Sequence, residues 1–156
     1  MQKITIILLL SLELIFAKSV NFVETKYIYA LDKSIKKSGV ISYDKESIKI
    51  NYSKPLKKTL LYSEDRLIIK KGEKEKSLNL SKKPKIKYFF LTLKALYLND
   101  ETYLKTLFAI SKKDDFIDYL PNSEGKRYIK NIRVKKDDFI NIEMSSGDKI
   151  DIKIIK

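Results

Sequence analysis

The side chains best suited to chemistry in this chain are carboxylates that occur as adjacent pairs. The pairs are Glu64-Asp65, Asp114-Asp115 and Asp137-Asp138. Carboxylate oxygens are the ligands that calcium prefers, so Asp114 and Asp115 with nearby Asp118 could form a calcium site. All three pairs fall in predicted turns, where aspartate is favoured for backbone reasons alone. We therefore interpret them as turn residues and predict no metal site.

Other catalytic groups are scarce. The 156-residue chain has no histidine and no cysteine, which removes the commonest general base, the thiol nucleophile and the usual zinc ligands. Its four glycines form no phosphate-binding loop, and no Gly-x-Ser-x-Gly motif occurs. The sequence therefore predicts a protein that is not an enzyme and that uses no cofactor.

The N-terminus has the pattern of a secretory signal peptide. Lys3 precedes an apolar run, Ile4–Leu12, and Ile15-Phe16-Ala17 fits a small-residue cleavage site. A retained membrane anchor is the alternative, but the apolar run is shorter than the about 20 residues that span a bilayer. We predict cleavage after Ala17, which leaves residues 18–156 as one exported, periplasmic domain. Without cysteine, its stability must come from a hydrophobic core.

The chain is strongly basic, with a net charge of +13, and almost all of its cations are lysines. The arginines are Arg66, Arg127 and Arg133. Arginine is the usual reader of base edges and phosphates, so its scarcity argues against nucleic-acid recognition. Lysine at alternate strand positions is also an ordinary way to keep sheet edges from associating. Attraction to anionic headgroups can follow from the same charge.

Most of the chain alternates as strands do. Ile48, Ile50 and Tyr52 share one face of a strand, opposite Lys49 and Asn51, as in a sheet with one buried side. A polar connection is expected at 32–37. The predicted strands are 22–31, 38–43, 47–52, 58–62, 66–70, 76–80, 115–120, 127–134, 139–144 and 149–155.

A helical segment interrupts these strands. After Pro84, residues 85–98 change to the i, i+3, i+4 spacing of a helix, yet the opposite side is also apolar. Asn99 or Asp100 can cap a second short helix that carries a stripe from Tyr103 to Phe108. An antiparallel meander this long must curl or close. The predicted fold is mainly β with a helical insertion (α+β): an unclosed antiparallel barrel or curved sheet with a short helical lid.

The apolar helix beside an incomplete barrel suggests two interpretations. It is either a core helix that plugs one end of the sheet, or a lid over an apolar cavity, since greasy ligands favour barrel interiors and mouths. The candidate cavity and lid residues are Ile48, Ile50, Tyr52, Phe89, Phe90, Leu93, Leu96, Tyr97, Leu104 and Leu107.

Several motifs, in order, carry a resemblance to a known family. They are Phe-x-x-x-x-Tyr at 22–27, Ser-Gly-x-Ile-x-Tyr at 38–43, Ile-x-Ile-x-Tyr-x-x-Pro at 48–55, a leucine- and aromatic-rich helical segment, and Leu-Pro at 120–121. With the signal peptide and the C-terminal amphipathic strands, this order resembles the LolA family of periplasmic outer-membrane lipoprotein carriers over nearly the whole exported chain.

The resemblance implies an unclosed barrel with helices across its mouth. It implies a carrier that accepts the acyl chains of lipoproteins from an inner-membrane ABC transporter and delivers them to an outer-membrane acceptor, as a monomer and without a cofactor. Three family features are missing: the N-terminal lid helix, an arginine near Tyr43-Asp44-Lys45-Glu46, and a tryptophan near the motif. The alternative function is an exported β-domain that binds another lipid, an envelope protein or a polymer through its basic surface.

Overall fold

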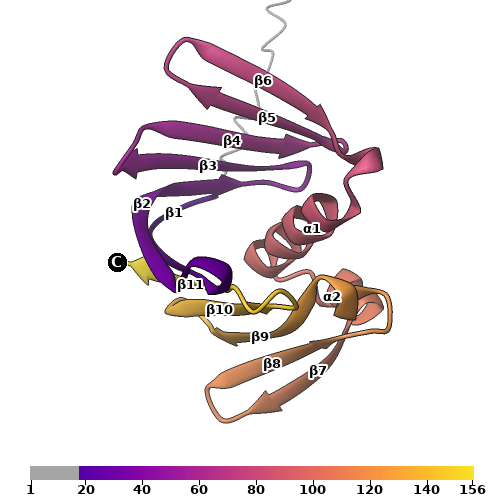
Figure 1. Ribbon diagram of the computed structural model, residues 1–156. Coiled ribbons are helices and arrows are strands. Elements are labelled where there is room, and N and C mark those ends of the chain that lie inside the picture. The colour runs from indigo at the N-terminus through magenta and orange to yellow at the C-terminus, as the bar shows by residue number, and fades with distance from the viewer. Residues whose placement is uncertain (1–17) are drawn as a thin grey trace, which may run out of the picture.

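The computed structural model describes residues 18–156, and the predicted signal peptide at 1–17 lies outside the described residues. Its strands form one antiparallel, 11-stranded sheet in the order β6-β5-β4-β3-β2-β1-β11-β10-β9-β8-β7 (Figure 1). The bounds are β1 Lys18–Ile28, β2 Lys33–Tyr43, β3 Ser47–Lys54, β4 Lys58–Ser63, β5 Arg66–Lys71, β6 Lys74–Asn79, β7 Phe108–Lys113, β8 Phe116–Pro121, β9 Ile129–Lys135, β10 Phe139–Met144 and β11 Lys149–Ile155.

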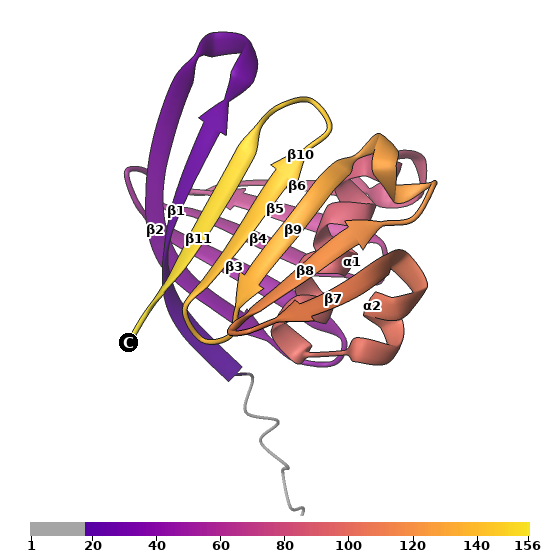
Figure 2. The ribbon, with the colours of Figure 1, turned by 90° about the horizontal axis from the view of Figure 1, so that it is seen from below.

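The sheet is curved and unclosed, because its outer strands β6 and β7 do not pair with each other. The pairing of β1 with β11 joins the N-terminal half of the sheet to the C-terminal half. Figure 2 shows the sheet folding round at these long central strands, so that its two halves face each other across a concave side. The predicted class, mainly β with a helical insertion and an unclosed antiparallel sheet, is confirmed.

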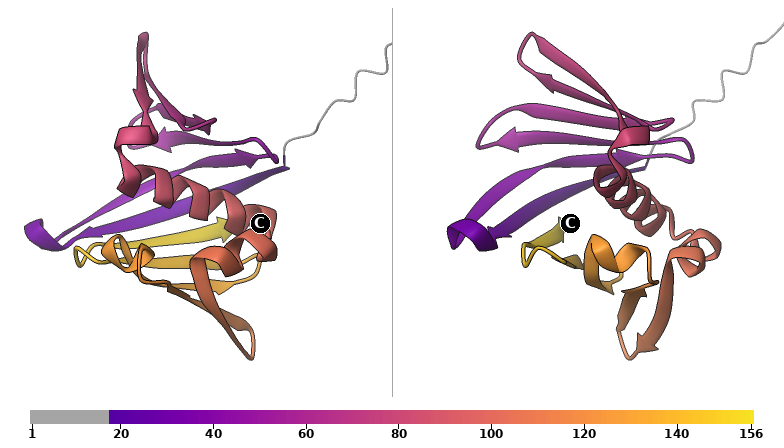
Figure 3. Two further views of the ribbon diagram at one scale, coloured as in Figure 1. Left: turned by 90° about the vertical axis from the view of Figure 1, so that its right-hand side faces the viewer. Right: turned by 45° about the vertical axis from the view of Figure 1, so that its right-hand side comes forward.

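Two helices, α1 (Pro84–Leu98) and α2 (Glu101–Leu107), connect β6 to β7. They lie between the two halves of the sheet, as the side views show (Figure 3). Pro84 begins α1, where its missing N–H costs nothing, and Asn99 ends it in the left-handed conformation. The Asp100 side chain then accepts a hydrogen bond from the Tyr103 N–H and caps α2. Neither helix is long and apolar enough to span a membrane.

Two sequence predictions about β1 and β2 are corrected. Residues 32–37 are not a polar connection, because β2 begins at Lys33 and pairs with β1 along its whole length. The strand predicted at 22–31 ends earlier, at Ile28, and the turn is a short 3-10 segment at Tyr29–Leu31. The lysines and serines of this stretch are acceptable in a strand because the hairpin end is largely exposed. Tertiary pairing therefore overrides their weak strand propensity.

Further corrections concern strand ends and number. Phe108 does not continue the stripe of α2; it is the first residue of β7, opposite Pro121. The Phe108 ring packs against Tyr88 of α1 and Tyr119 of β8, in the same core as the apolar side chains of α2. For that reason residue 108 continues the apolar spacing of the helix although its backbone is extended. A 3-10 turn at Gly125–Arg127 takes the start of the strand predicted at 127–134. The sheet has 11 strands, one more than the ten predicted segments, because residues 108–113 also form a strand, β7.

The core fills the concave side. Its buried side chains come from alternate positions of the strands, such as Ile48 and Ile50 of β3 and Ile150 and Ile152 of β11. Gly39 permits the close approach of β2 and β3 at an irregularity in their register, since a Cβ there would collide with the Asn51 carbonyl oxygen.

Candidate functional site

Helix α1 covers the concave face of the N-terminal half of the sheet. The side chains of Phe90, Leu93 and Ala95 on this helix are buried against the sheet. The Phe90 ring stacks on Tyr62 of β4 with centroids 5.5 Å apart, and Tyr97 lies 5.2 Å from the ring of Tyr43 at the end of β2. The helix is apolar on most of its circumference, which is expected of a helix that contacts protein or ligand on several sides.

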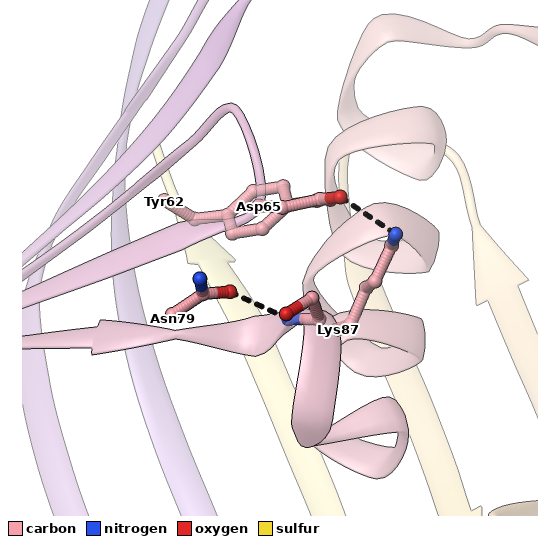
Figure 4. Close-up of polar contacts among 5 residues, drawn as sticks. Tyr62, Asp65, Asn79 and Lys87 are labelled. Atoms are coloured by element: carbon pink, nitrogen blue, oxygen red, sulfur yellow. Dashed lines mark hydrogen bonds and ion pairs between the residues drawn. The ribbon is translucent and has the colours of Figure 1, made fainter.

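Polar contacts at the start of α1 hold it to the β4–β5 turn. The Lys87 ammonium lies 2.7 Å from the Asp65 carboxylate (Figure 4). The Tyr62 hydroxyl donates to the same carboxylate at 3.4 Å. Nearby, the Asn79 side chain accepts the Ser81 N–H at 2.9 Å. Burial, and then the charge of Asp65, raise the pKa of Tyr62 to about 12. Lys87 and Asp65 are partly exposed, so their pair adds little stability.

A cavity of about 200 Å³ lies between α1 and strands β1–β4 and β11. Phe89, Phe90 and Leu93 of α1 form one wall, and the sheet forms the other with further apolar residues. Those sheet residues are Phe22, Ile41, Ile50, Leu60, Ile150 and Ile152. Such a lining can hold apolar groups by removing them from water.

A polar cluster interrupts this apolar lining. Glu24 of β1 is only 8% exposed and faces the cavity beside Lys26, Lys37 and Tyr52. The Tyr52 hydroxyl donates to its carboxylate at 2.8 Å, and the Lys37 ammonium lies 3.3 Å away. Burial, and then the Glu24 charge, raise the pKa of Tyr52, so its hydroxyl stays protonated and remains a donor. The cluster compensates a charge that would be costly to bury alone.

A second, smaller cavity of about 120 Å³ lies at the other end of α1. Leu96 and Tyr97 contribute from the helix, and Tyr43, Ile117 and Ile140 contribute from the two halves of the sheet. Lys135, Lys136 and Asp137 add charged groups to the lining of this smaller cavity. Helix α1 therefore contributes side chains to two small cavities on the concave face.

Three buried hydroxyl groups on α1 have no hydrogen-bond partner: those of Tyr88, Thr92 and Tyr97. No other buried side-chain nitrogen or oxygen in residues 18–156 shares this condition. Each unpaired buried group costs about 1–3 kcal/mol. Burial, and then Tyr43 and Glu24, raise the pKa of Tyr97, so ionisation does not relieve this cost near neutral pH. The packing of α1 against the sheet is therefore less stable than its apolar contacts alone would make it.

The structure brings many of the predicted site residues together. Ile50, Tyr52, Phe89, Phe90 and Leu93 line the larger cavity, and Leu96 and Tyr97 line the smaller one.

The remaining predicted residues have other positions. Ile48 and Leu104 are completely buried in the core, and Leu107 is partly buried against it, so none of these lines either cavity. The prediction missed Phe22 and Glu24 of β1 and Ile152 of β11. The alternation of isoleucines at 150, 152 and 154 could have indicated that these side chains of β11 share the buried face. Nothing in the local sequence marks the charged Glu24 as a buried residue of β1.

The paired carboxylates occupy turns, as predicted. Glu64 and Asp65, and likewise Asp114 and Asp115, form two-residue turns between strands. Asp118 accepts two hydrogen bonds from Arg133, at 2.6 and 2.9 Å, and is not directed at Asp114 or Asp115 as a ligand set would require. Among residues 18–156, no group of three or more carboxylate, imidazole or thiol side chains is arranged to hold a metal ion.

Comparisons with known proteins add no relative. No protein-family model matches the chain, and a search of curated proteins finds no significant match.

Proposed function

We propose that this protein is an exported, LolA-like carrier that binds acyl chains on its concave face beneath α1. The observation that carries the proposal is the apolar cavity between α1 and the sheet, lined by Phe22, Ile50, Phe89, Leu93 and Ile152. Burial of each acyl methylene contributes about 0.8 kcal/mol, so a chain that enters this space is held without any covalent bond.

The closed cavity is small for this task. Pockets for drug-sized ligands span roughly 300–1,000 Å³, whereas this one is about 200 Å³. A long acyl chain therefore requires α1 to move away from the sheet and join the two small cavities. The unpaired hydroxyls of Tyr88, Thr92 and Tyr97 favour this movement, because an open helix would expose them to water.

The resemblance of the sequence to lipoprotein carriers supplies the biological setting of the proposal. The cargo is an acylated lipoprotein or another lipid, received from an inner-membrane ABC transporter and passed through the periplasm to an outer-membrane acceptor. A carrier of this kind must open to take up and release its cargo, and the unsatisfied polar groups of the closed state lower the free-energy cost of that opening.

The test is saturable binding of an apolar fluorescent probe to the purified protein, with mass spectrometry of any lipid that copurifies. Leu60→Trp places extra volume in the cavity and should weaken probe binding about tenfold or more. Leu61→Trp is the matched control, because the next residue of β4 faces the opposite side of the sheet.

The expected result is lipid in the native protein, saturable probe binding, loss of binding in Leu60→Trp and near-normal binding in Leu61→Trp. Absence of both lipid and probe binding would contradict the carrier proposal. The alternative, a domain that binds an envelope protein or polymer through its basic surface, would then be preferred.

A further inference from the structure

The open end of the concave face is lined by lysines. Lys71 of β5 lies opposite Lys74 of β6, and Lys76 lies opposite Ile69. Strand alternation places all of them on the same face as the buried Leu67, which means the concave face. These residues lie at or near the β5–β6 turn. That turn lies at the same end of the strands as the β1–β2 and β3–β4 turns, away from α1 (Figure 3, right).

The same row of charges continues into the cavity. Lys58 of β4 lies opposite Tyr52, while Lys26 and Lys37 line the cavity itself. We call Lys26, Lys37, Lys58, Lys71, Lys74 and Lys76 the lysine rim. Of these, Lys37 alone has an ion pair within residues 18–156, with Glu24. The rim therefore connects an apolar cavity to a strip of uncompensated positive charge.

Carboxylates are almost absent from this face. Within strands β1 to β6 of the described structure, alternation places Glu24 alone on the concave side. Glu75 of β6 lies on the convex side, where it pairs with Lys70. Unpaired lysines that converge on one edge repel each other, and a bound anion relieves this repulsion. The charge of this face thus favours an anionic ligand over a neutral or cationic one.

We infer that the lysine rim binds the anionic headgroup of a phospholipid whose acyl chains occupy the cavity beneath α1. This inference rests on the proposed function, because the chains need the cavity. Lysine suits such a headgroup, since its ammonium acts as a point charge and imposes no bidentate geometry. Charge and apolar space adjoin at Lys26 and Lys37, so a single amphipathic molecule can contact both.

The experiment is displacement of an apolar fluorescent probe from the purified protein by two short-chain lipids below their micelle concentrations. Dihexanoyl phosphatidylglycerol is anionic, and dihexanoyl phosphatidylcholine has the same chains but no net charge. Glycerol phosphate, which has no chains, separates headgroup binding alone from lipid binding. The rim variant carries Lys71→Gln, Lys74→Gln and Lys76→Gln. The control variant removes equal charge from the convex face through Lys36→Gln, Lys49→Gln and Lys153→Gln.

The wild-type protein should prefer the anionic lipid by about tenfold, and the preference should shrink at high salt. The rim variant should lose most of that preference and the control variant should keep it. Glu24→Gln, which frees Lys37, should increase the preference. Glycerol phosphate should not displace the probe.

Two other results have distinct meanings. Equal displacement by both lipids, equal losses in the rim and control variants, or displacement by glycerol phosphate would overturn the headgroup inference and leave the acyl-chain proposal standing. A protein that binds no probe at all would overturn the proposed function and the inference together.

Discussion

Replacement of Thr92 by valine should stabilise the protein. Thr92 is 1% exposed in the middle of α1, and its hydroxyl has no hydrogen-bond partner. Valine keeps the branched shape and has nearly the same helix propensity, so the main change is removal of the unpaired polar group. That group costs about 1–3 kcal/mol. The free energy of unfolding should rise by a similar amount, and the midpoint temperature by roughly 3–5 °C for each kcal/mol.

The assay is urea unfolding followed by circular dichroism, with the same denaturant dependence expected for both proteins. Thr106→Val is the matched control: Thr106 is exposed on α2, and its hydroxyl donates to the Tyr103 carbonyl at 2.6 Å. This control should leave stability unchanged or lower it slightly. If Thr92→Val is no more stable than the wild type, the argument that the α1 hydroxyls destabilise the closed state is wrong.

The same variant tests movement of α1. If the helix leaves the sheet to admit ligand, the Thr92 hydroxyl gains water in the open state, and valine removes that gain. A shift of about 1–3 kcal/mol toward the closed state should slow probe association roughly 5- to 150-fold. Greater stability with unchanged association would mean that the ligand enters without displacement of α1.

Two further predictions concern the sheet. Gly39→Ala should lower the free energy of unfolding by about 1–3 kcal/mol, because the new Cβ would collide with the Asn51 carbonyl. In the same urea assay Gly72→Ala should lower it less, because a Cβ at position 72 meets no atom and carries only the strain of a positive φ. Arg133→Gln should lower the stability only slightly near neutral pH, since the ion pair with Asp118 is exposed. Hydrogen bonds from Arg133 lower the pKa of Asp118, so this cost is present above the unfolded pKa of about 3.9 and disappears as the pH falls below the folded value. A difference that persists at pH 2 would contradict it.

Local sequence features predicted much of the fold. The alternating isoleucines of β11 follow the strand period. The Pro84 start and the Asn99 end define α1, and the side chain of Asp100 caps α2. These signals act within a few residues, so they need no knowledge of the rest of the chain. The helix at 85–98, the β-rich class and the open sheet could therefore be predicted.

Features set by distant pairing could not be predicted in this way. The hairpin end of β2 is a strand because β1 pairs with it, although Lys33 and its neighbours have little strand preference. Phe108 has helical spacing but belongs to β7, since Pro121 of β8 lies opposite it. In each case the partner strand decides the backbone conformation.

The candidate site divides in the same way. The sequence alone determined that α1 would be apolar on nearly all sides and that the chain would offer lysines rather than catalytic groups. The tertiary structure decided which side chains face the cavity. Glu24 lies inside because β1 pairs with both β2 and β11 in a register that places Phe22 and Glu24 on the concave face. A shift of one residue would exchange the two faces, and only long-range pairing fixes that choice.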